Sequence, residues 1–177
     1  METAQKEAGI VGRGNREGAR LFREWFEELT RAAEEGRGGA YVFVMGSLGE
    51  LLRVFDLPVV FPEINSLQTA VRKVAHEYLN EAEDLGYSPD ICGYVKADIA
   101  TQHRGGQLPM GRIPKPSIAV LTNACNTYIK WAEIWERMYH MPSYVLDVPG
   151  SRADGLLPGP GDRDFENDRR YVSAQLR

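Results

Sequence analysis

The apolar residues of this chain follow two alternating patterns, one typical of strands and one typical of helices. Four short, nearly continuous apolar runs have the length expected of strands buried on both faces of a parallel sheet. These runs are residues 41–45, 57–61, 117–122 and 144–148. Around them, apolar residues recur at helical spacing, and the three clearest helical stretches are residues 21–33, 67–85 and 128–139.

The alternation of strands and helices predicts an α/β fold, because such chains form a parallel sheet whose two faces are covered by the connecting helices. We expect a Rossmann-like or flavodoxin-like domain of about four parallel strands with right-handed crossovers, formed by residues 16–150. Residues 1–15 are polar and glycine-rich, and we expect a flexible leader there. Residues 151–177 are expected to form a loop and the start of a helix that leads into a missing second half.

Capping and breaking residues refine the helix boundaries. Asn65 or Ser66 is expected to cap one long helix, and Gly86 to end it in a left-handed conformation. A short helix is expected over residues 92–100. Residues 102–115 carry several glycines and prolines in their second half, so an irregular loop is predicted there.

The composition is that of an ordinary globular protein, with 177 residues of which 43% are hydrophobic and 26% charged. The net charge of -4 argues against binding to the phosphate backbone of a nucleic acid. No apolar run is long enough to cross a bilayer, and the N-terminus lacks the core of a signal peptide. We therefore expect a cytoplasmic protein with no membrane partner.

Two cysteines are the most informative residues. Cys125 follows the strand-like run 117–122 and precedes a helix, which places its thiol where α/β proteins carry their chemistry. The dipole of that helix favours a thiolate there. Cys92 precedes another short helix. Their spacing matches no zinc or redox motif, so the residues alone leave buried thiols, a disulfide and metal ligation open, with buried thiols favoured.

Three segments around these positions resemble one known family. They are Asp90–Val95, Cys125–Trp131 and Tyr144–Pro149. They are similar to the benzoyl-CoA reductase and 2-hydroxyacyl-CoA dehydratase family, and the similarity runs from about Tyr41 to the end. Members of that family are longer, so the resemblance identifies this chain with the amino-terminal portion of a catalytic, cluster-binding subunit.

The resemblance implies a 4Fe-4S cluster that is held by three cysteines, with the fourth iron position open to solvent or substrate. Cys92 and Cys125 match the first two ligands, and the third would lie in the second half. Two thiolates are short of the usual set for a cubane cluster. This chain alone is therefore expected to hold a cluster poorly or not at all.

The implied reaction is the one-electron reduction of an acyl-CoA thioester to a ketyl radical anion. Its implied partners are an ATP-hydrolysing iron-sulfur activator, which donates the electron, and a homologous second catalytic subunit. The chain has no phosphate-binding P-loop motif, which agrees with ATP being handled by a partner. The residues around Cys125 resemble the benzoyl-CoA reductase branch more than the 2-hydroxyacyl-CoA dehydratase branch.

Four further residues are candidates for the site. Ser47 and Glu63 each follow a predicted strand, and the resemblance implies that they act near the reacting carbons of the substrate. The alternative is that Ser47 caps the next helix and that Glu63 is a loop carboxylate at the start of a helix. His103 and Arg112 are candidates for binding the substrate, with a solvated loop as the alternative. A different class of function also stays open, namely a non-catalytic scaffold or assembly subunit whose thiols only fill space.

Overall fold

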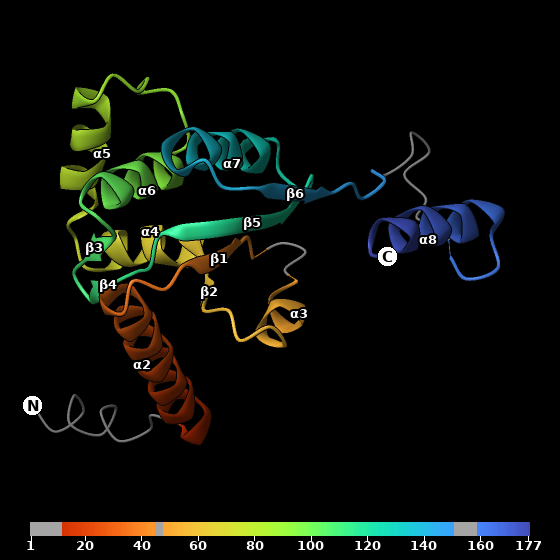
Figure 1. Ribbon diagram of the computed structural model, residues 1–177, viewed down its shortest axis with the longest axis horizontal. Coiled ribbons are helices and arrows are strands. Elements are labelled where there is room, and N and C mark those ends of the chain that lie inside the picture. Colours follow the sequence, from red (N-terminus) through yellow and green to blue (C-terminus); the bar gives the residue numbers. More distant parts are fainter. Residues whose placement is uncertain (1–11, 45–47, 151–158) are drawn as a thin grey trace, which may run out of the picture.

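The computed structural model describes residues 12–44, 48–150 and 159–177. Its main sheet has four parallel strands in the order β2-β1-β5-β6 (Figure 1). They are β1 (Gly39–Val42), β2 (Val59–Val60), β5 (Pro116–Thr122) and β6 (Ser143–Leu146). The predicted α/β fold with four parallel strands is confirmed.

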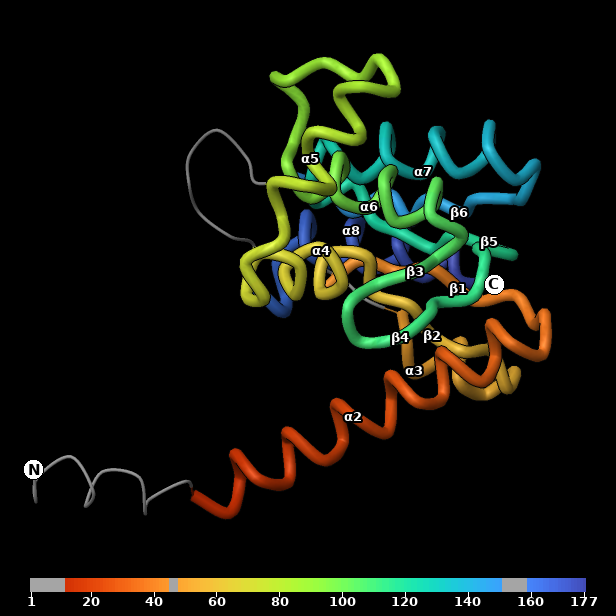
Figure 2. Tube along the Cα trace, turned by 90° about the vertical axis from the view of Figure 1, so that its left-hand side faces the viewer, coloured from red at the N-terminus to blue at the C-terminus, as the bar shows by residue number. Residues whose placement is uncertain are grey.

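Helices cover both faces of this sheet, as expected. The described helices are α2 (Arg13–Glu34), α3 (Gly49–Arg53), α4 (Pro62–Val71), α5 (Ala75–Asp84), α6 (Gly93–His103), α7 (Asn126–Tyr139) and α8 (Arg163–Gln175). Of these, α8 lies to the side of the sheet and covers neither face (Figure 1). In Figure 1, α5, α6 and α7 lie above the sheet, and α2 and α3 lie below it. Figure 2 shows α2 extending as a long rod from the rest of the protein. None of the helices in the described ranges combines the length and apolarity that a bilayer crossing requires.

The strand order creates one switch point. The chain runs from β1 to β2 on one side and later from β5 to β6 on the other, so the connections diverge between the neighbouring strands β1 and β5. Tyr41 lies opposite Ala119 in this pair. In open α/β sheets, ligands bind outside the carboxyl ends of the strands at such a point. The segments that follow Val42 and Thr122 are therefore where a site is expected.

The larger core lies between the sheet and helices α6 and α7, and a cluster of aromatic rings packs within it. Phe43 stacks on Tyr128 with ring centroids 3.9 Å apart, and Tyr41 meets Trp135 edge-on at 4.9 Å. Trp131 is 1% exposed beside them. Aromatic pairs of this kind add stability beyond the area that they bury. This core fixes α7, and with it the position of the preceding Cys125, against the sheet.

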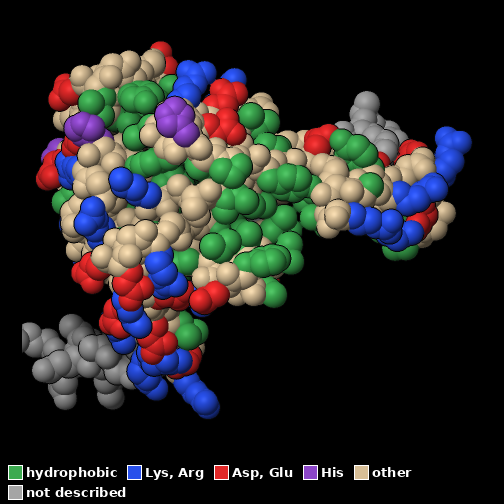
Figure 3. All heavy atoms as spheres, viewed as in Figure 1, with side chains coloured by type: hydrophobic (Ala, Val, Ile, Leu, Met, Phe, Trp, Pro, Cys, Tyr) green, Lys and Arg blue, Asp and Glu red, His purple; other side chains and the backbone are tan. Residues whose placement is uncertain are grey.

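The smaller core lies on the α3 face and leaves that face partly uncovered. Figure 3 shows hydrophobic side chains gathered over α3 and the adjoining part of the sheet. The exposed members in the described ranges include Val44, Leu51, Val54, Phe55 and Tyr144. The two faces of the sheet are therefore unequal, with the better-packed face carrying α7.

A charged residue is buried in the larger core. Asp98, on α6, is 2% exposed, and its Oδ2 accepts hydrogen bonds from the indole N–H groups of Trp131 and Trp135, each at 2.7 Å. Its Oδ1 accepts a third bond, at 3.0 Å, from Gln102 Nε2. Burial raises the pKa of this carboxyl, and the three hydrogen bonds oppose that effect. Burial of Tyr139, together with the charge of Asp98, raises the pKa of that phenol to about 12.

The single long helix predicted over 67–85 is wrong. The structure has two helices there, α4 and α5, separated at Lys73, whose φ of 60° is left-handed. The first of them begins at Pro62, a residue suited to the first helical turn, and neither Asn65 nor Ser66 is its cap. Ser66 is instead buried and donates from Oγ to Tyr94 O at 2.8 Å. Val71, expected in the buried stripe, is 63% exposed.

The irregular loop predicted over 102–115 is partly ordered. Helix α6 continues to His103, and β3 (Gln107–Leu108) pairs antiparallel with β4 (Gly111–Arg112). Gly106 lies between α6 and β3, and this position requires glycine because its φ is 86° and a Cβ there would lie 2.3 Å from Ile113 O. At the amino end, α2 begins at Arg13, inside the range expected as a leader.

We expect Asp98→Asn to destabilise the protein by about 1–3 kcal/mol, because three donors point at this side chain and the NH2 group of asparagine cannot accept from any of them, whereas a carboxyl oxygen accepts in either protonation state. Folding raises the pKa of the Asp98 carboxyl. The stability that this carboxyl contributes is therefore fully present below its ordinary pKa of 3.8 and is lost as the pH rises through its pKa in the folded protein. Urea denaturation should therefore show a larger cost at about pH 4 than at about pH 7. Asp84→Asn, which removes an exposed carboxylate, is the control for the loss of one negative charge. A destabilisation by Asp98→Asn that grows as the pH rises would contradict this account.

Candidate functional site

The carboxyl edge of the sheet brings together three segments that are distant in sequence. Val44 follows β1, Glu63 stands in the first turn of α4 just after β2, and Cys125 follows β5. Parallel strands end at the same edge, so these residues share one side of the molecule. The position predicted for Cys125, between a strand and a helix, is confirmed.

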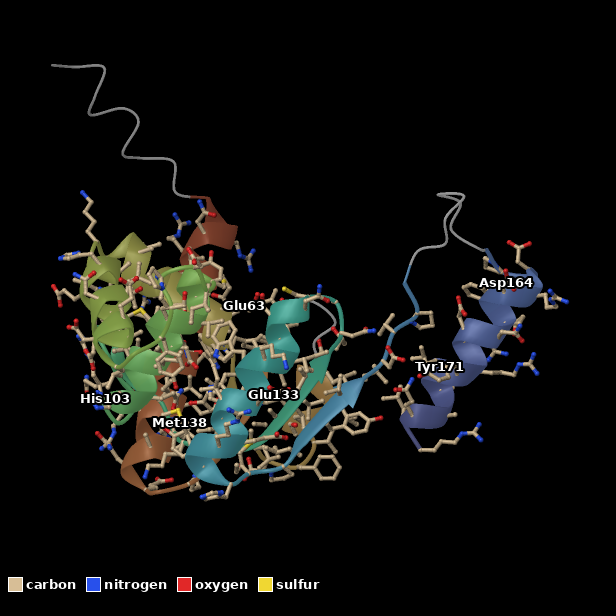
Figure 4. The ribbon with its side chains drawn as sticks, turned by 90° about the horizontal axis from the view of Figure 1, so that it is seen from above. Glu63, His103, Glu133, Met138, Asp164 and Tyr171 are labelled. Atoms are coloured by element: carbon tan, nitrogen blue, oxygen red, sulfur yellow. The ribbon has the colours of Figure 1, made fainter. Side chains whose placement is uncertain are left out.

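Glu63 is held by donors from both sides of the switch point. Its Oε2 accepts a hydrogen bond of 2.8 Å from the backbone N–H of Val44. Its Oε1 accepts one of 2.8 Å from the phenol O–H of Tyr128, in the first turn of α7. Figure 4 shows Glu63 beside the start of α7. The carboxylate thus has a fixed orientation at the centre of the edge.

Tyr128 connects this carboxylate to the cysteine turn. It is 2% exposed and stacks on Phe43, and its backbone N–H donates to Cys125 O at 3.0 Å. Helical periodicity predicts a core position for Tyr128, which is correct, but it does not reveal the bond to Glu63. The available signal was a hydroxyl on the buried face of the helix that follows Cys125, since a buried phenol usually finds a hydrogen-bond partner.

The turn before Cys125 is fixed from the other side by Asn123. Its Nδ2 donates to Val148 O at 3.1 Å and also to Asp147, while its Oδ1 accepts from Val148 N at 2.9 Å. These bonds join the end of β5 to the segment that follows β6. The Cys125 backbone is extended, with φ of −135° and ψ of 129°, and the residue is partly buried against the larger core.

Cys92 stands directly before α6 and is exposed. A cavity of about 390 Å³ lies between the start of α6 and the start of α7. It is lined by Cys92 and Val95 from one side and by Asn126, Lys130 and Trp131 from the other. The thiol of Cys92 therefore borders a cavity whose opposite wall is the helix that begins next to Cys125. Neither cysteine forms a disulfide.

His103 and Arg112 lie away from this edge. His103 ends α6, about 16 Å along the helix from Cys92, and its Nδ1 pairs with Glu81 Oε1 at 2.9 Å. Arg112 donates from Nε to Gly105 O at 2.9 Å, in the hairpin that leads into the start of β5. The structure does not bring these two residues to the cysteines, so their role in substrate binding stays a prediction without support from geometry. Ser47 lies outside the described residues.

The two thiols fit part of a ligand set for an iron-sulfur cluster. Thiolates are the usual ligands of such clusters, and both cysteines stand directly before the start of a helix. Within the described ranges, no group of three or more His, Cys, Asp or Glu side chains is arranged to hold a metal ion. The residues present can supply two ligands, and the others would come from elsewhere.

A family model described as 2-hydroxyglutaryl-CoA dehydratase, D-component, matches residues 45–177, which is most of the chain. The chain belongs to the benzoyl-CoA reductase and 2-hydroxyacyl-CoA dehydratase family. This confirms the resemblance drawn from the sequence around Cys92 and Cys125.

Curated relatives of this family differ in the reaction that their names state. The chain is 34% identical to a subunit of benzoyl-CoA reductase from Thauera aromatica over 154 residues, which are 86% of this chain and 34% of that protein. It is 31% identical over 159 residues to the (R)-2-hydroxyisocaproyl-CoA dehydratase alpha subunit of Clostridioides difficile, and these residues are 88% of this chain and 36% of that protein. It is 30% identical over 129 residues to the (R)-phenyllactyl-CoA dehydratase alpha subunit of Clostridium sporogenes, and these residues are 72% of this chain and 29% of that protein. The chain thus spans about a third of the length of these relatives.

The two cysteines should differ in reactivity in the metal-free protein. Cys92 is exposed and Cys125 is partly buried, so an alkylating agent should modify Cys92 first. Intact-mass measurements over time would separate the two rates, with Cys125→Ser reporting Cys92 alone and Cys92→Ser reporting Cys125 alone. Equal rates, or a faster Cys125, would show that the exposure of the two thiols differs from that described.

Proposed function

We propose that this chain is the amino-terminal portion of a catalytic subunit of an iron-sulfur enzyme that reduces an aromatic acyl-CoA, benzoyl-CoA, by one-electron chemistry. The observation that carries the proposal is that Cys92 lines a cavity whose opposite wall is the helix that begins next to Cys125, in a chain of this family. Glu63 is held by two hydrogen bonds at the carboxyl edge of the sheet. The relative with 34% identity, a benzoyl-CoA reductase subunit, supports this branch.

In this proposal Cys92 and Cys125 are two ligands of a 4Fe-4S cluster. The cluster, when bound, supplies one electron to the thioester carbonyl of the substrate. The electron is resupplied by an ATP-hydrolysing iron-sulfur activator, and a homologous second catalytic subunit completes the enzyme in the cytoplasm. The chain would hold the cluster, orient the substrate and exclude water, because in cofactor enzymes the cofactor carries the reaction and the protein supplies binding and position.

Glu63 is the proposed proton-transfer group. A carboxylate can move a proton in the reaction only if it is held within reach of the substrate. The two donors from Val44 and Tyr128 give Glu63 such a fixed position at the switch point. Trp131 forms part of the wall of the cavity that Cys92 borders, and its hydrogen bond to Asp98 holds the indole in place. A fixed indole at this wall limits the access of water to the thiol of Cys92.

A second candidate is 2-hydroxyacyl-CoA dehydration. It is favoured by the description of the matching family model and by the two relatives named as dehydratase alpha subunits. Both reactions begin with the same electron transfer to a thioester, so the arrangement of Cys92, Cys125 and Glu63 suits either. Assays with benzoyl-CoA and with 2-hydroxyacyl-CoA esters would separate them, because an enzyme of one branch should turn over one class of substrate.

We expect the full-length protein that carries this chain, purified without oxygen, to contain iron and acid-labile sulfide. Cys125→Ala should lower both to background, because a cubane cluster depends on each thiolate ligand. Met138→Ala is the matched control, since it removes a sulfur from the far end of α7 (Figure 4) and should leave iron unchanged. Absence of iron from the unaltered protein, or unchanged iron in Cys125→Ala, would favour the non-catalytic scaffold.

We expect Glu63→Gln to lower turnover by roughly 10²- to 10⁴-fold while leaving the iron content unchanged. Glutamine keeps the shape and can still accept from Val44 N–H, but it cannot transfer a proton. Glu77→Gln is the control, because it removes an exposed acidic residue from the equivalent first turn of α5. Steady-state rates near wild type in Glu63→Gln would exclude Glu63 as the proton-transfer group.

A further inference from the structure

Both oxygens of Glu63 are engaged, and the two donors differ in kind. The Val44 donor is a peptide N–H in the segment that leaves β1, two residues after the last residue of that strand. The Tyr128 donor is a side-chain O–H that reaches across from α7, 65 residues away in sequence. A carboxylate held by one donor can still rotate about that bond. A second donor from a different element removes this freedom.

Tyr128 is itself held rigidly. Its ring lies flat on Phe43, with an interplanar angle of 9°, and it is almost fully buried. Its backbone N–H binds the carbonyl of Cys125. A continuous chain of contacts therefore runs from Cys125 through Tyr128 and Glu63 to Val44, and it crosses the switch point from β5 to β1.

We propose that Tyr128 is a positioning residue for Glu63, whose phenol O–H fixes the carboxylate relative to the turn that carries Cys125. The inference rests on the proposed function, in which Glu63 transfers a proton and Cys125 is a cluster ligand. Packing against Phe43 requires only an aromatic ring, which phenylalanine would provide equally well. The hydroxyl is therefore the part of Tyr128 that packing does not explain.

The test is Tyr128→Phe, which keeps the ring on Phe43 and removes the donor. In isotope-labelled protein, NMR can follow the hydrogen exchange of the Val44 amide, which donates to Glu63 Oε2. Without the phenol, Glu63 should leave this position more often, and the Val44 amide should exchange about tenfold faster. Glu63→Ala, which removes the acceptor, sets the upper limit of this effect.

Two internal controls separate positioning from a loss of stability. The amide of Val42 lies in β1, within the sheet, and it should keep its rate in Tyr128→Phe. Tyr139→Phe removes another phenol from α7, one that donates to Gln102, and it should leave Val44 unchanged. An unchanged Val44 rate in Tyr128→Phe, or an equal increase at Val42 and Val44, would overturn the proposal.

Kinetics of the assembled enzyme distinguish this proposal from the function on which it rests. Tyr128→Phe should lower kcat about tenfold with KM unchanged, a smaller loss than that of Glu63→Gln. If Glu63→Gln abolishes turnover while Tyr128→Phe keeps full kcat, the positioning role is wrong and the proposed function stands. If Glu63→Gln leaves turnover intact, Glu63 is not the proton-transfer group. The catalytic role of Tyr128 is then wrong as well, even if the Val44 amide exchanges faster in Tyr128→Phe.

Discussion

The hydrogen bonds to Glu63 are the contacts on which the architecture of the site depends. A parallel sheet places the ends of β1 and β5 side by side, but it does not fix the loops that leave them. Glu63 accepts one bond from each side of this junction, from Val44 and from Tyr128. Bonds to a charged acceptor are stronger than those between neutral groups. The carboxylate thereby gives a fixed geometry to an edge that would otherwise be built from independent loops.

The buried Asp98 has a comparable effect one layer deeper. A carboxylate without a counter-ion is costly in an apolar core unless its oxygens are hydrogen-bonded. Two indole N–H groups from α7 meet that need, and in doing so they hold α6 and α7 together. These are the two helices whose starts border the cavity next to Cys92. The spacing of the cavity walls thus depends on a polar contact inside an aromatic core.

The pattern of apolar residues along the sequence was sufficient to predict the strands and the position of Cys125. Buried parallel strands are short continuous apolar runs, and a helix follows each one in this kind of fold. It was not sufficient at Lys73, where a left-handed residue other than glycine breaks a helix without a glycine or proline signal. Nor could it find the partners of Asp98 or Glu63. Asp98 binds residues 33 and 37 positions away, and Glu63 binds one 65 positions away. Such pairs arise from tertiary packing, which periodicity does not encode.

The unequal exposure of the two thiols bears on what a complete site requires. Cluster potentials depend on solvent exposure and on hydrogen bonds to sulfur, so the protein surrounding a low-potential centre is as important as its ligands. Cys125 is partly buried against the core, but Cys92 faces solvent on this chain. The described residues thus supply two thiols, one ordered carboxylate and both walls of the cavity next to Cys92. The proposed chemistry then needs further protein on the open side, both for the remaining ligation and to exclude water. The relatives, of which this chain spans about a third, have the additional length to provide it.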